Sequence, residues 1–191
     1  ISVLQAAPLT GANADINTFF SYDAGTTTYT NDTTDANDAD TGDVNVVDSG
    51  GVGDIGYFGM NYKYDRLFIT TTTGATGASG AITWEYCTSS DCSTWTTIGT
   101  ISDKFTATGA RTLSMDASST GLASGTVNGV TAYWIRARVT TAFTTPATVA
   151  QMSTREFNLK VKVVDELGNG ITGLVPGSFT IANCTTTTKY T

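Results

Sequence analysis

The residue types that most enzymes use for catalysis are scarce in this chain. It has no histidine and three cysteines. Because imidazole is missing, the sequence excludes a Ser-His-Asp triad, a Cys-His pair and a His-ligated zinc. A glycoside hydrolase would need two carboxyl groups about 5–9.5 Å apart. The glutamates are only Glu85, Glu156 and Glu166, and Glu85 is expected beside an arginine. We therefore expect a protein that is not an enzyme.

Aspartates gather in one polar stretch, residues 29–50. Asp35, Asp38, Asp40 and Asp43 could present several carboxylates to one Ca²⁺ ion. Their spacing is not that of an EF-hand, because Asp43 occupies the position that requires glycine. The alternative is a solvated acidic loop that like-charge repulsion holds extended. The sequence thus predicts no required cofactor and leaves Ca²⁺ binding open.

The aromatic side chains of the middle strands could either stack on sugar rings or pack the core. Alternation in AITWEYC and GVTAYWIRARVTTAF puts most of them on the same face as the aliphatic residues, which favours the core. The expected core aromatics are Trp84, Tyr86, Trp95 and Tyr133. Trp134 falls on the opposite face with Arg136 and Arg138, so these three residues are the candidate glycan contacts. Glu85 is expected to pair with an arginine across the strands.

Two of the cysteines stand close together in YCTSSDCSTW. A disulfide between Cys87 and Cys92 would close a short polar loop at the tip of a hairpin. The alternative is a pair of reduced thiols, and a metal site would need ligands that are missing nearby. Cys184 has no partner in this scheme.

The elements that must position these residues are short strands. Sustained helical periodicity is absent, and Gly-rich turns at roughly 8–12-residue spacing predict an all-β sandwich or barrel. The net charge of −7 over 191 residues argues against nucleic-acid binding. The mean hydropathy is −0.03 and no run of about 18 apolar residues occurs, so membrane insertion is not expected.

Three segments are expected along the chain. Residues 1–28 form a weakly patterned N-terminal segment, and residues 29–150 form the sandwich. Residues 151–191 form a linker and a partial β segment around FNLKVKVVDELGNGITGL. The last segment is too short to bury a core of its own. It could pair with the sandwich, pair with a neighbouring chain or begin a further domain, and we expect the last two together.

A series of motifs covers residues 54–140: DIGYFGM, YDRLFITTTTG, ITWEYC, WTTI, SDKFTATGARTLSM and NGVTAYWIRARV. This series resembles a jelly-roll β-sandwich module that recurs in tail, baseplate and fibre proteins of bacteriophages and in bacterial surface proteins. The positions that match are Trp84-Glu85-Tyr86, Trp95, Asp103 and Tyr133-Trp134-Ile135-Arg136-Ala137-Arg138. The resemblance implies a jelly-roll-type antiparallel β-sandwich with structural rather than catalytic motifs. The C-terminal LKVKVVDELGNGITGL resembles the opening strands of immunoglobulin-like repeats.

Two functions are compatible with this sequence. The favoured one is a structural or adhesive module of an extracellular assembly, either a phage virion component (tail, fibre or decoration) or a subunit of a surface filament. Its partners would be copies of itself or other subunits of that assembly. The alternative is a carbohydrate-binding module of a secreted or cell-surface protein, with surface glycans as partners. Both place the protein outside cells, on a virion or on a cell surface.

Overall fold

The computed structural model describes residues 2–4, 13–40, 44–77, 81–115, 121–156 and 162–164. The chain divides into two compact units, one formed by Thr10–Phe157 and the other by Ile1–Leu9 with Asn158–Thr191. In the smaller unit, β1 (Ser2–Leu4) pairs antiparallel with β14 (Lys162–Val164). The rest of the predicted immunoglobulin-like segment lies outside the described residues.

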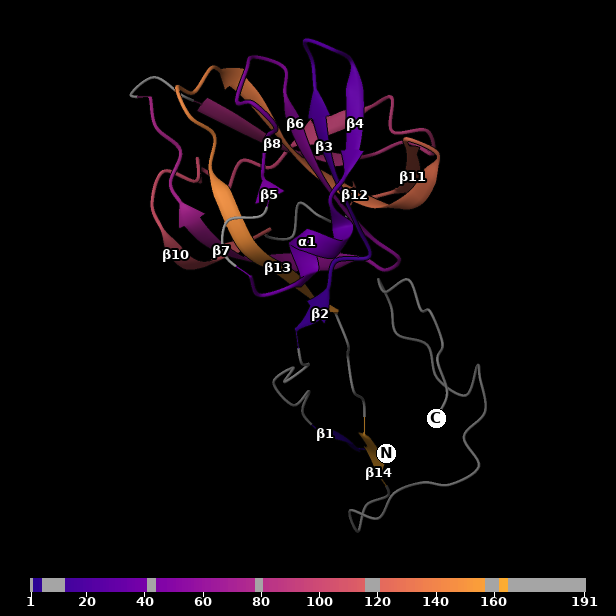
Figure 1. Cartoon of the computed structure of the whole chain (residues 1–191). Coiled ribbons are helices and arrows are strands. Elements are labelled where there is room, and N and C mark those ends of the chain that lie inside the picture. Colours follow the sequence, from indigo (N-terminus) through magenta and orange to yellow (C-terminus); the bar gives the residue numbers. More distant parts are fainter. Residues whose placement is uncertain are drawn as a thin grey trace. The chain divides into compact units, whose positions relative to one another are not determined.

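The larger unit contains two antiparallel sheets, which confirms the predicted all-β sandwich (Figure 1). The seven-stranded sheet has the order β4-β3-β6-β12-β8-β9, with β11 paired to β12. Its strands are β3 (Thr18–Asp23), β4 (Thr28–Asn31), β6 (Ile55–Met60), β8 (Ala81–Cys87), β9 (Trp95–Thr97), β11 (Ser124–Val127) and β12 (Val130–Thr141). The five-stranded sheet has the order β10-β7-β13-β2, with β5 paired to β13. Its strands are β2 (Ala14–Asp15), β5 (Val44–Asn45), β7 (Tyr64–Thr73), β10 (Gly109–Ser114) and β13 (Thr148–Glu156). A short helix, α1 (Thr33–Asn37), packs against β13.

Period-two alternation decides which side chains fill the space between the sheets. In β12, Ile135, Ala137 and Val139 are at most 1% exposed and lie on one face, while the residues between them lie on the other. In β8, Trp84 also points inward, and its ring stacks on Phe58 with centroids 5.7 Å apart. The sequence predicted both alternations. They hold because each strand has one face covered by the opposite sheet.

The N-terminal boundary of the sandwich, predicted at residue 29, is wrong. β3 lies inside the seven-stranded sheet, where Phe19 pairs with Phe58 of β6 and is fully buried. This segment has a weak local pattern, and its pairing partner lies far along the chain, so its place is set by tertiary contacts. At the other end β13 continues to Glu156, beyond the predicted boundary at residue 150.

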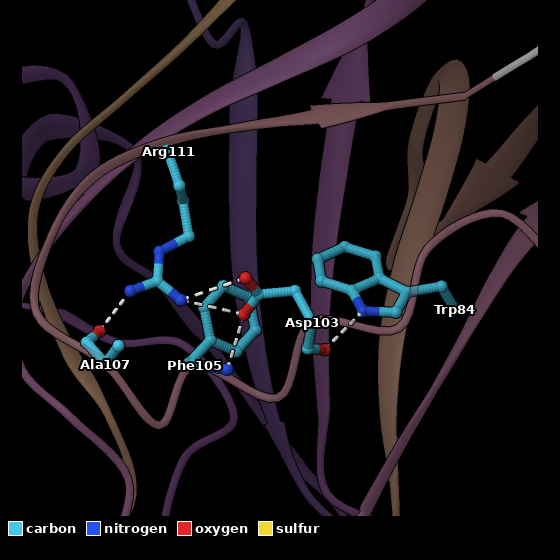
Figure 2. Close-up of polar contacts among 5 residues, drawn as sticks. All are labelled: Trp84, Asp103, Phe105, Ala107 and Arg111. Carbon is cyan, nitrogen blue, oxygen red and sulfur yellow. Dashed lines mark hydrogen bonds and ion pairs between the residues drawn. The ribbon is translucent and has the colours of Figure 1, made fainter.

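Asp103, one of the motif positions, fixes the connection between β9 and β10 (Figure 2). Its carboxylate accepts hydrogen bonds from Nη1 of Arg111 at 2.9 Å and from the backbone N–H of Phe105 at 2.6 Å. Its backbone carbonyl accepts a hydrogen bond from the indole Nε1 of Trp84 at 2.9 Å. Arg111 also donates to the carbonyl of Ala107. Asp103 therefore has a structural role, because it ties this loop to Trp84 of β8 and to Arg111 of β10.

Candidate functional site

The seven-stranded sheet has a second face, which points away from the core and carries its own cluster of aromatic and charged side chains. We call it the outer face. Its main residues are Phe20, Tyr22, Tyr29, Ile55, Tyr57, Glu85, Trp95, Trp134, Arg136 and Arg138. Strand register builds it in rows: Arg136 of β12 lies opposite Tyr57 of β6 on one side and Glu85 of β8 on the other. Arg138 lies opposite Ile55 in the next row. Residues from distant parts of the sequence thereby share one surface.

Trp134 forms the floor of the outer face and does not reach solvent. It is 0% exposed, and its Nε1 donates a 3.0 Å hydrogen bond to the carbonyl of Gly125. Its indole lies across Gly59 of β6, where a Cβ atom would come within 2.6 Å of the ring, and it stacks on Phe20 with centroids 5.7 Å apart. The prediction that Trp134 contacts a glycan directly is therefore wrong. Its strand face was predicted correctly, but this part of the face is itself covered.

The aromatic rings nearer to solvent come from other strands. Tyr29 on β4 is 37% exposed and Trp95 on β9 is half-buried. Both rings flank Tyr57, each with centroids 5.8 Å from it, and Tyr22 packs on Tyr29 at 4.7 Å. Trp95 was predicted among the core aromatics, and this is wrong, because β9 places its ring on the outer face.

The remaining predicted core aromatics lie on the inner side of the sheet. Trp84 and Tyr86 are 1% and 8% exposed, and Tyr133 is half-buried against the same core.

Two arginines share one glutamate on the outer face. Nε of Arg136 lies 2.7 Å from Oε2 of Glu85, and Nε and Nη2 of Arg138 lie 3.0 and 3.1 Å from its Oε2 and Oε1. Burial by itself would raise the pKa of Glu85, but the hydrogen bonds and charges of Arg138 and Arg136 outweigh it, so this pKa lies below its usual value. The same contact with Glu85 raises the pKa of Arg138. The carboxylate is thus ionised and orients both guanidinium groups.

Arg136 also holds the ring of Trp95. Its guanidinium carbon lies 4.1 Å from the centroid of the Trp95 ring, a cation–π contact. Tyr57 lies beneath these groups at 5% exposure, and burial raises the pKa of its hydroxyl well above the usual value. The Tyr57 hydroxyl is therefore neutral at ordinary pH, and the charged side chains in this part of the outer face are those of the Arg–Glu–Arg group.

The predicted disulfide between Cys87 and Cys92 is present and lies at the end of the outer face. It packs in the same cluster as Trp134, and glycine at position 125 leaves space for it, since a Cβ there would lie 2.5 Å from Sγ of Cys92. Asp91 completes the loop. Hydrogen bonds from the backbone and side chain of Ser93 and from the Ser89 hydroxyl lower its pKa to about 2.

Removing the disulfide should destabilise the protein moderately. Replacing Cys87 and Cys92 together by serine reopens a short loop, which corresponds to about 2 kcal/mol of unfolding free energy in the chain-entropy model. Urea denaturation of the double variant measures the loss. The wild-type protein in reductant should match it, and an unchanged midpoint in both would show that the bond does not hold the loop.

The predicted Ca²⁺ ligands are not brought together in the part of the chain that the structure describes. Asp35 lies on α1, and Asp38 and Asp40 are exposed in the segment after it, with the backbone N–H of Asp40 bonded to the Asp38 carboxylate. Asp43 lies outside the described residues. Ca²⁺ binding there stays a prediction.

A different acidic trio, not predicted from the sequence, brings its carboxylates within 4.8 Å of one another: Asp23, Asp48 and Asp54. Asp54 is 2% exposed and accepts hydrogen bonds from the Ala24 and Gly51 backbone N–H groups and from the Ser49 hydroxyl. Burial raises the pKa of Asp48, and the neighbouring carboxylates raise it further. Asp54 therefore has a structural role, because its hydrogen bonds join the turn at Ala24 to the loop at Ser49 and Gly51.

The tyrosines of the outer face were missed in the sequence, although local signals were present. Tyr22 and Tyr29 flank a Gly-containing turn, and they become direct partners in the β3–β4 hairpin. Tyr57 alternates with Phe58 in GYFGM, which puts it on the face opposite the core. Only the β6–β12 register shows that it meets Arg136.

Comparison with known proteins found a distant similarity to solved structures. No protein-family model matches the chain, and no curated protein matches it. Among solved structures, the CBM32 of AlyQ in complex with 4,5-unsaturated mannuronic acid is 11% identical with a TM-score of 0.39, over 75% of this chain and 97% of that one. CpGH89CBM32-6 of Clostridium perfringens is 9% identical with a TM-score of 0.36, over 58% and 75%.

A third similar structure is chitosan-binding module 1 of a chitosanase/glucanase from Paenibacillus sp. IK-5. It is 12% identical with a TM-score of 0.33, over 56% of this chain and 70% of that one. These values reflect a distant likeness, so the function of this chain has to be inferred from its own side chains. In the described residues, no helix is long and apolar enough to cross a membrane.

Proposed function

We propose that this chain is a non-catalytic carbohydrate-binding module that recognises glycans on the outer face of its seven-stranded sheet. The observation that carries the proposal is the exposed ring of Tyr29 and the half-buried ring of Trp95 on the same face as the accessible guanidinium of Arg138. The sequence predicted this function as the alternative to a structural or adhesive role in an extracellular assembly. The exposed ring of Tyr29 beside the half-buried ring of Trp95 favours glycan binding.

The chemistry of the outer face suits a sugar. A pyranose ring has an apolar face that packs on an aromatic ring, and its hydroxyls need hydrogen-bond donors and acceptors around the edge. Tyr29 and Trp95 offer the rings, while Arg138 and the tyrosine hydroxyl groups offer the polar contacts. Tyr29 packs on buried Phe20, which stacks on Trp134, and Trp95 packs on buried Tyr57, so these rings lose little conformational entropy on binding.

The same face is less suited to a protein partner. A stable interface buries about 1,200–2,000 Å² around an apolar centre. Among the described residues, the large hydrophobic side chains that are exposed are Tyr29 and Val52, and Val52 lies in the loop before β6. A role in an extracellular assembly stays a prediction. Sedimentation of the concentrated protein tests it, because an assembly subunit should form oligomers.

Binding should depend on the ring of Tyr29. On an array of neutral and acidic glycans, we expect the wild-type protein to bind at least one class. Tyr29→Ala should weaken that binding by about tenfold or more, because it removes the stacking surface. Tyr29→Phe, which keeps the ring, should retain most of the affinity. Calorimetric titration with the best glycan measures each variant.

Val52→Ala is the matched control, since it removes an exposed hydrophobic side chain outside the outer face. It should leave glycan binding unchanged. Circular dichroism of each variant verifies that the fold is intact. Absence of binding to every glycan class, or equal affinity in Tyr29→Ala and wild type, would overturn the proposal.

A further inference from the structure

We infer that the glycan bound on the outer face is acidic, an oligosaccharide whose sugar units carry carboxylates. This inference rests on the proposed function and names its ligand class. It comes from the way in which two arginines are arranged around one glutamate.

The charges of the Arg–Glu–Arg group do not balance. Arg136 and Arg138 carry one positive charge each, and both hydrogen-bond to the single carboxylate of Glu85. One unit of positive charge therefore remains, on a chain whose formal net charge is −7. Arg138 is the less buried of the two guanidinium groups and shares a carboxylate that Arg136 also pairs with, so a second anion at its free edge would neutralise the remaining charge.

Arg138 is the guanidinium that a ligand can reach. Its side chain is 35% exposed, compared with 15% for Arg136 and 9% for Glu85. Nε and Nη2 of Arg138 face Glu85, which fixes the plane of the guanidinium. The other edge, formed by Nη1 and the second hydrogen of Nη2, keeps donors for a further acceptor. Two parallel N–H groups on one edge match the two oxygens of a carboxylate.

The aromatic rings set the size of the ligand. Tyr29, Tyr22, Ile55 and Arg138 occupy one row across four strands. Neighbouring strands lie about 4.8 Å apart, so Tyr29 and Arg138 are separated by about 14 Å at the backbone. A ligand that touches both must extend across the strands, as an oligosaccharide does. A neutral oligosaccharide could stack on the rings, but it would cover Arg138 without supplying a counter-charge.

A comparison of oligouronides with their methyl esters tests this inference, because the two ligands share one sugar backbone and differ in charge. Titration calorimetry of the full chain uses oligogalacturonate and oligomannuronate, each as the free acid and as the methyl ester. We expect the acid form to bind about tenfold more tightly or better. Raising the salt concentration should weaken binding of the acid and leave that of the ester nearly unchanged.

Arg138→Gln should abolish the preference for the acid form. Arg66→Gln is the control: it removes the same charge from an exposed position on β7, in the other sheet, and should keep the preference. Esters that bind as tightly as acids, or equal losses in the two variants, would overturn the inference. If neutral glycans bind the outer face and uronides do not, the inference fails while the proposed function stands. If neither class binds, both fail.

Discussion

Replacing Trp134 by alanine should lower the free energy of unfolding by about 3–5 kcal/mol, the usual cost of emptying a large buried aromatic site. The side chain is fully buried, stacked on Phe20 and edge-on to Tyr57 at 6.3 Å. The variant also leaves the carbonyl of Gly125 without the indole donor. Guanidinium denaturation followed by far-UV circular dichroism measures the loss.

Trp95→Ala provides the comparison for Trp134. Trp95 lies on the same face but is half-buried, so its removal should cost clearly less, about 1–2 kcal/mol. We expect the opposite order for glycan affinity, with Trp95→Ala the more damaging substitution in variants that remain folded. A loss below about 1 kcal/mol for Trp134→Ala would mean that this indole is not part of the packed floor.

Glu85→Gln should be the second most damaging substitution described here. It leaves Arg136 and Arg138 without their shared carboxylate. Removing one partner of a buried ion pair lowers the free energy of unfolding by about 3–5 kcal/mol. We expect about 3 kcal/mol, the lower end, because water still screens Arg138. Urea denaturation at neutral pH measures it.

The pH dependence of stability tests the role of Glu85 independently. The pKa of Glu85 is lowered in the folded protein, so its contribution to stability is present above the unfolded pKa of about 4.3 and is lost as the pH falls through the lower folded value. The wild-type protein should therefore lose more stability than Glu85→Gln between about pH 5 and pH 2. Parallel curves for the two proteins over this range would contradict the role given to Glu85.

A double-mutant cycle measures the interaction energy between Glu85 and Arg138 separately from the other contacts of the two side chains. Glu85→Gln with Arg138→Gln removes one charge of each sign, and the combined loss should be smaller than the sum of the two single losses. Additive losses would show that the two side chains do not interact, whatever their distance in the structure.

Much of the strand structure was predictable from local sequence. In β12, alternation put Ile135 and Val139 on one side and Arg136 and Arg138 on the other, and the structure has the same arrangement. The all-β sandwich followed from many such short segments and their Gly-rich turns. Side-chain alternation is a property of a single strand, so it can be read without knowledge of the strand's neighbours.

The candidate site was only partly predictable. The sequence identified Arg136, Arg138 and Glu85 as residues on the polar faces of strands. It could not show that both arginines share one carboxylate, since this depends on the register of β8 against β12. It also could not show that Trp134 is fully buried while Trp95 is half-buried on the same face.

The sequence by itself determined that this chain lacks histidine chemistry, that it forms strands with one apolar face, and that Arg136 and Arg138 leave β12 on the side away from the core. The tertiary structure alone decided that β3 and β4 bring Tyr22 and Tyr29 to that side. The physical reason is that neighbours in an antiparallel sheet are chosen by pairing between distant segments. Local sequence fixes the direction of a side chain, but only this pairing fixes what it meets.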